Sequence, residues 1–170
     1  MRSLTLLLCV VALPLAAQQP ATAPQDSVRA ESAVAPLVPN AAQTKYLRGL
    51  QTAGRGVSQL KQGVNRVAGA GRDSTRLAQA GRMLGGFCGS ARGFLVTGRG
   101  RMQANVFDDS TAVRAKRLAA QIDTLIRFAP SCEAKAAKQT DSTAAHLFLE
   151  LRAYEAALKD FRGAIGLPTK

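Results

Sequence analysis

Apolar residues recur at helical spacing in three long stretches of the chain. Over residues 46–67 and 147–165 the spacing alternates between four and three residues, and a shorter run of the same kind covers 118–129. This period places the apolar side chains of each stretch on one face of a helix. Asn40 can cap the first helix, Gly69 or Gly71 can end it, and Pro130 is expected to stop the third.

The tripeptide Asp-Ser-Thr occurs three times, at residues 73–75, 109–111 and 141–143. Each copy precedes a stretch of helical apolar spacing. Asp, Ser and Thr side chains accept hydrogen bonds from the free amides of a first helical turn, and the carboxylate complements the helix dipole. The repeat therefore predicts three helix starts that share one way of capping, although a ligand motif or a modification site is an alternative.

The first seventeen residues have the three parts of a secretory signal peptide. Arg2 is followed by an apolar run over 4–15, and Ala17 is a small residue at the expected cleavage point. The run is too short to span a bilayer, and no small residue precedes Cys9, which disfavours a lipoprotein anchor. We expect 1–17 to be removed and the rest to be periplasmic or secreted, and not membrane-spanning after cleavage.

Two cysteines, Cys88 and Cys132, remain after cleavage, and an oxidising compartment favours a disulfide between them over two buried free thiols. Facing residues of an antiparallel hairpin are equidistant from its turn, so the pair predicts a turn near Ser110. The second helix would then run from about 74 to 107, through the Gly-Arg-Gly-Arg sequence at 98–101.

Glycines line one side of this second helix at every fourth residue, and three more recur at every seventh residue of the first helix: Gly81, Gly85, Gly89 and Gly93, then Gly49, Gly56 and Gly63. Glycine is costly inside a helix, so a bare stripe indicates close approach of two backbones. We expect this packing within the bundle, or else between two copies of the chain. Arg82 and Arg92 interrupt the second stretch and argue against insertion into a membrane.

These elements predict an all-α protein, an up-down-up-down four-helix bundle with one disulfide between its second and third helices. The domain would cover 41–170. Residues 18–40 contain four prolines among small polar residues and are expected to form a flexible leader.

The chain is strongly basic, with 23 Lys and Arg against 11 Asp and Glu and a net charge of +12. Such a charge favours polyanionic partners, although a GC-rich genome also enriches arginine. If the second and third helices form the predicted hairpin, its tip gathers five arginines that could hold phosphate or carboxylate groups. They are Arg92, Arg99, Arg101, Arg114 and Arg117.

No motif indicates catalysis or a cofactor. His146 is the only histidine and lacks neighbours at metal-ligand spacing, and no glycine-rich loop is followed by Gly-Lys-Ser or Gly-Lys-Thr. We therefore expect a protein that is not an enzyme, with no metal site. It would act through protein–protein interaction in the cell envelope, with an envelope protein or by self-association. The alternative is an electrostatic binder of anionic envelope polymer or lipid headgroups at the arginine-rich hairpin tip. Export disfavours chromosomal DNA as a partner.

Overall fold

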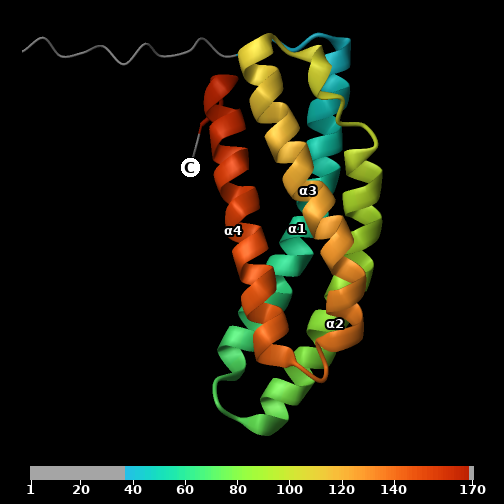
Figure 1. Cartoon of the computed structure of the whole chain (residues 1–170), viewed down its shortest axis with the longest axis vertical. Helices are drawn as coiled ribbons and strands as arrows, with labels where there is room; N and C mark the ends of the chain where they lie inside the picture. Colours follow the sequence, from blue (N-terminus) through green and yellow to red (C-terminus); the bar gives the residue numbers. More distant parts are fainter. Residues whose placement is uncertain (1–36, 169–170) are drawn as a thin grey trace, which may run out of the picture. The chain divides into compact units, whose positions relative to one another are not determined.

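The computed structural model describes residues 37–168, and these form four helices and one short 3₁₀ turn (Figure 1). The elements are α1 (Ala41–Ala70), α2 (Ser74–Arg99), η1 (Ala104–Val106), α3 (Asp109–Lys135) and α4 (Thr140–Ala164). Successive helices run antiparallel and pack along their lengths (Figure 1). The predicted all-α four-helix bundle is confirmed. The signal peptide and residues 18–36 of the leader lie outside the described residues.

The helix starts follow the sequence in part. Asn40 caps α1 through a capping box with Gln43, as expected, and Asp73 caps α2 by accepting from the amide of Arg76. At the second Asp-Ser-Thr the cap is Asp108, one residue earlier than expected, because its carboxylate accepts from the amide of Thr111. The prediction is wrong for the third copy, since α4 begins at Thr140 without a side-chain cap. There Thr140 and Thr143 are buried instead.

Helices α1 and α2 pack closely through the glycines that recur every seventh residue. A Cβ atom at Gly49, Gly56 or Gly63 would lie 2.7 or 2.8 Å from an atom of α2: the carbonyl oxygen of Gly98, that of Ala91, and Cδ1 of Leu84, respectively. The partners on α2 also recur every seventh residue, so all three pairs are equidistant from the turn at Asp73. The predicted close packing within the bundle is confirmed at these positions.

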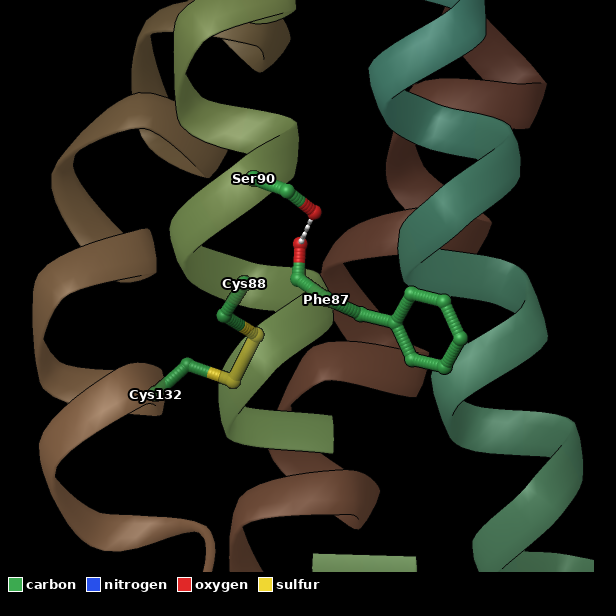
Figure 2. The surroundings of a disulfide bond; sticks show 4 residues. All are labelled: Phe87, Cys88, Ser90 and Cys132. Carbon is green, nitrogen blue, oxygen red and sulfur yellow. Dashed lines mark hydrogen bonds between the residues drawn. A yellow bond between two sulfur atoms is a disulfide. The ribbon is translucent and has the colours of Figure 1, made fainter. Parts of the chain in front are cut away.

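The disulfide joins α2 to α3, as the cysteine spacing predicted. Cys88 and Cys132 are bonded, with their Cα atoms 6.0 Å apart. The neighbouring residue Phe87 points the other way, toward α1, so this turn of α2 faces both of its neighbours (Figure 2).

The glycine stripe on α2 serves the contact with α3 only over its first half. At Gly81 a Cβ would meet Thr140 and the carbonyl of Ala136, and at Gly85 it would lie 3.1 Å from the carbonyl oxygen of Glu133. At Gly89 it would meet only the side chain of Glu133, and at Gly93 it would meet nothing within 4 Å. The stripe is thus a packing surface at Gly81 and Gly85, is covered by a side chain at Gly89, and is open at Gly93.

Helix α2 is shorter than predicted: it ends at Arg99, and residues 100–108 form turns, η1 and extended backbone. The expected register survives because this segment continues along the bundle beside α1 before α3 begins (Figure 1). Gly98 packs at Gly49 and Ala53, whereas the carbonyl of Val106 accepts from the side chain of Gln43. The segment therefore advances along the bundle axis about as far as an α-helix would, at 1.5 Å per residue. The glycines at 98 and 100 end the helix without moving the turn.

Pro130 does not end α3, contrary to the prediction, and the helix continues to Lys135. Proline removes one amide donor and crowds the preceding turn. Beyond it, however, Cys132 is bonded to α2 and Ala136 is fully buried. Tertiary packing on both sides of the proline therefore outweighs its local cost.

Three aromatic rings close the core at the end of the bundle where α1 begins. Tyr46, Phe107 and Phe161 pack with ring centroids 5.0–5.3 Å apart, and the Tyr46 hydroxyl donates to the carbonyl of Ala115 at 2.9 Å. Burial raises the pKa of Tyr46 well above its usual value. Beside this cluster the amide of Leu37 donates to the carbonyl of Ile165 at 3.1 Å, so the last residues of the predicted leader are tied to the end of α4.

Candidate functional site

The five arginines predicted to gather at one hairpin tip lie in separate places. In the register set by the disulfide Arg99 packs against the middle of α3, where its Nε atom lies 2.9 Å from a carboxylate oxygen of Asp123. Arg92 is seven residues further down α2, and Arg101 lies beside Gly49 of α1. Arg114 and Arg117 belong to the first turns of α3, about 13 Å and about 9 Å along that helix from Asp123, respectively.

Arg114 and Arg117 line a hollow between the start of α3 and the end of α4. Its volume is about 840 Å³, and Lys159, Asp160 and Asp108 also line it. A carboxylate oxygen of Asp160 lies 3.6 Å from the Nη1 atom of Arg117, while the Arg114 guanidinium donates to the carbonyl of Ser110 at 3.2 Å. The Thr111 amide lowers the pKa of Asp108, so this acid stays ionised. The three basic groups here are thus offset by two carboxylates.

Positive charge concentrates instead on the α1–α2 hairpin. Residues 41–99 contain a single acidic residue, Asp73, which caps α2. Residues 100–168, by contrast, contain ten basic and eight acidic residues. The hairpin's basic residues are also ten in number: Lys45, Arg48, Arg55, Lys61, Arg66, Arg72, Arg76, Arg82, Arg92 and Arg99.

Four of these residues form a line along α1, which we call the basic stripe: Lys45, Arg48, Arg55 and Arg66. All four are exposed. Arg48 and Arg66 are eighteen residues apart, which is five full turns, so they share one side of the helix about 27 Å apart along its axis. Within the part of the chain that the structure describes, none of the four is paired with a carboxylate. The stripe therefore presents its charge to solvent.

The stripe borders the outer groove between α1 and α2. Gln59 of α1 accepts a hydrogen bond from Ser90 of α2 at 3.1 Å, and the Arg66 guanidinium lies over the ring of Phe87, 5.9 Å from its centroid. Phe94, seven residues along α2 from Phe87, is 36% exposed. Polar groups, aromatic edges and arginines thus share one surface. Figure 2 shows Phe87 reaching from α2 toward α1 at the level of the disulfide.

The sequence held a signal for this stripe. Arg48, Arg55 and Arg66 lie off the apolar face of the first helix at spacings of seven and eleven residues, and no acidic residue occurs between Asn40 and Arg72. The predicted cluster lay on the second hairpin instead, because Arg99, Arg101 and Arg114 flank its turn in the sequence. The α1–α2 and α2–α3 hairpins differ in their number of acidic residues rather than in their number of basic residues.

A second surface is apolar and lies between α1 and α4. Two hollows of about 270 and 230 Å³ open there, on either side of the ion pair between Lys61 and Glu155. The larger hollow is lined by half-buried Leu50 and Leu158, and the smaller one by Phe148, which is 47% exposed. We call this surface the α1–α4 seam. It offers apolar contact area.

Chemistry-bearing side chains do not converge within residues 37–168. The structure has no group there of three or more His, Cys, Asp or Glu side chains that could hold a metal ion. His146 packs edge-on against Phe128, with ring centroids 4.6 Å apart, and its Nε2 atom lies 3.4 Å from Glu150. No helix in this range is long and apolar enough to cross a membrane.

Comparisons with models of protein families, with curated proteins and with solved structures find no match to this chain. Its function must therefore be inferred from its own charges, contacts and hollows.

Proposed function

We propose that the protein is an exported, non-enzymatic binding protein whose α1–α2 hairpin holds an elongated anionic polymer of the cell envelope. The observation that carries this proposal is the separation of charge: the hairpin has ten basic residues and one acidic residue, whereas the rest of the described chain is nearly balanced. A face of one sign attracts polyanions and raises their rate of association. Export is supported by the disulfide, which is typical of oxidising compartments.

The shape of the basic surface favours a polymer over a single small anion. The stripe follows the axis of α1 for about 27 Å, so its charges are arranged in a row. A flexible chain that follows this row would contact several guanidinium groups in turn. Exposed Phe94 in the adjoining groove adds a flat apolar edge on which parts of the polymer without charge can rest.

Two double variants test the proposal at equal net charge. Arg48→Gln/Arg55→Gln removes two charges from the stripe, and Arg82→Gln/Arg92→Gln removes two from other sides of α2. The probe is linear inorganic polyphosphate, with binding followed by calorimetry. We expect the stripe variant to bind at least tenfold more weakly than the control variant, which loses the same charge from the hairpin but no charge from the stripe.

Equal weakening in both variants would contradict a role for the stripe, and no binding by the unmodified protein would contradict the proposal as a whole. Phosphatidylglycerol vesicles provide the comparison with a lipid surface. Binding to the vesicles but not to polyphosphate would also overturn the proposal of a polymer ligand.

The α1–α4 seam favours a second candidate function, docking of an amphipathic helix from another envelope protein. Its two hollows supply apolar contacts, and Arg152 and Arg162 at their margins suit a helix flanked by acidic residues. Phe148→Glu should abolish capture of such a partner from envelope extract in high salt, and a peptide of the partner's helix should bind the unmodified protein. A dimer in sedimentation that Phe148→Glu dissociates would instead make a second copy the occupant.

A further inference from the structure

A hollow near the turn between α1 and α2 brings two arginines from different helices together. It has a volume of about 240 Å³ and is lined by Arg66 of α1 and by Arg76 and Gln79 of α2. Its remaining lining includes the small residues Gly69, Ala70 and Ala80. Nothing lies within 4 Å of where a Cβ at Gly69 would be, so the backbone is open to a ligand on that side.

Each guanidinium group has a neighbour in the protein. Arg66 lies over the ring of Phe87, and one of its terminal nitrogens is 4.0 Å from the sulfur of Met83. The Nε atom of Arg76 is 3.8 Å from the carboxylate of Asp73, whose other oxygen accepts from the backbone amide of Arg76. The carboxylate is therefore engaged with the start of α2 and lies near one edge of the guanidinium. The other N–H groups of both arginines remain available as donors.

The geometry points to a phosphate-binding site in this hollow, in which Arg66 and Arg76 clamp one phosphate group and the Gln79 side chain donates a further hydrogen bond. A phosphate dianion presents oxygens in several directions and so matches donors that arrive from two helices, whereas a carboxylate offers two oxygens in one plane. This inference rests on the proposed function, because the hollow lies at the Arg66 end of the basic stripe and would anchor one group of a bound polymer.

Titration with sodium phosphate and pyrophosphate at constant ionic strength, followed by amide chemical shifts, tests the site. We expect shifts at Gly69, Ala80 and their neighbours, with sodium acetate at the same concentration giving none. Arg66→Gln and Arg76→Gln should each weaken phosphate binding at least tenfold, and the control Arg82→Gln should change it less than twofold. Arg66→Lys keeps the charge but loses the planar fork, so it should also weaken binding.

The outcomes separate this site from the proposed function. Equal weakening by all three Gln variants, or equal shifts with acetate, would overturn the phosphate clamp while leaving polymer binding by the stripe intact. Loss of polyphosphate binding in Arg48→Gln/Arg55→Gln with phosphate shifts retained would support both. Binding of the Arg76→Gln variant to phosphatidylglycerol vesicles and to polyphosphate identifies whether lipid or polymer supplies the phosphate group, since only the true source should bind more weakly than it does to the unmodified protein. Unchanged binding of both would contradict the clamp.

Discussion

Two glycines two residues apart in α1 provide a test of how closely the bundle is packed. A Cβ added at Gly54 would meet nothing within 4 Å. A Cβ added at Gly56 would lie 2.8 Å from the carbonyl oxygen of Ala91 and 3.1 Å from a side-chain carbon of Leu95. The variants Gly54→Ala and Gly56→Ala therefore make the same chemical change in the same helix, one on an open side and one against α2.

The expected energies follow from these distances. Alanine is a better helix former than glycine by about 0.5–1 kcal/mol, and both variants gain this amount. Overpacking in a well-packed interface costs about 1–3 kcal/mol, and only Gly56→Ala incurs it, because the obstructing atom belongs to a helix backbone. The free energy of unfolding should thus rise in Gly54→Ala and be about 1–3 kcal/mol lower in Gly56→Ala than in Gly54→Ala.

Urea denaturation of the two oxidised proteins, followed by circular dichroism in the far ultraviolet, measures this difference. The unfolding midpoint of Gly54→Ala should lie above that of the unmodified protein, and the slopes should agree, so that the midpoints report stability. Equal midpoints for the two variants would refute the packing of α1 against α2 in the register that pairs Gly56 with Ala91.

Three further predictions concern the disulfide, the buried phenols and the helix caps. Reduction of the Cys88–Cys132 bond, which closes a separation of 44 residues, should lower the free energy of unfolding by about 4 kcal/mol in denaturant titrations; no loss would mean that the crosslink constrains little. Burial raises the pKa of Tyr46 and of Tyr154 above the ordinary value of 10, so the stability that these protonated phenols contribute is complete below pH 10 and falls as the pH rises further. The ultraviolet absorbance of phenolate should therefore appear together with unfolding rather than before it. Asp73→Ala should cost about 1 kcal/mol because it removes a helix cap, whereas Asp141→Ala, at an end without a side-chain cap, should cost less than half of that; equal losses would contradict the observed capping.

The four helices and the disulfide could be predicted because each leaves a local or arithmetic signal. Apolar spacing marks the buried face of α1 and α4, and the midpoint between Cys88 and Cys132 places the turn near Ser110, where α3 begins. The position of the turn depends only on the distance that the chain covers along the bundle axis on each side of it. The prediction holds even though residues 100–108 are not α-helical, because this segment rises along α1 as an α-helix would.

The errors arose where tertiary packing outweighs a local preference. Pro130 would end an isolated helix, but the buried residues beyond it keep α3 intact. The third Asp-Ser-Thr resembles a cap, yet Thr143 is buried and α4 begins before the motif, at Thr140. Spatial relations between helices, such as the hollow that Arg66 and Arg76 share, leave no signal in spacing along one helix.

The salt dependence of polymer binding tests the central claim most directly, because it counts the charge contacts that the basic stripe makes. The measurement is the slope of log K against log salt concentration for polyphosphate with the unmodified protein, Arg48→Gln/Arg55→Gln and Arg82→Gln/Arg92→Gln. If each contact contributes roughly 0.7, as for flexible single-stranded polymers, loss of two stripe contacts should reduce the slope by about 1.4, and the control should reduce it less. Equal slopes for all three proteins would contradict binding at the stripe.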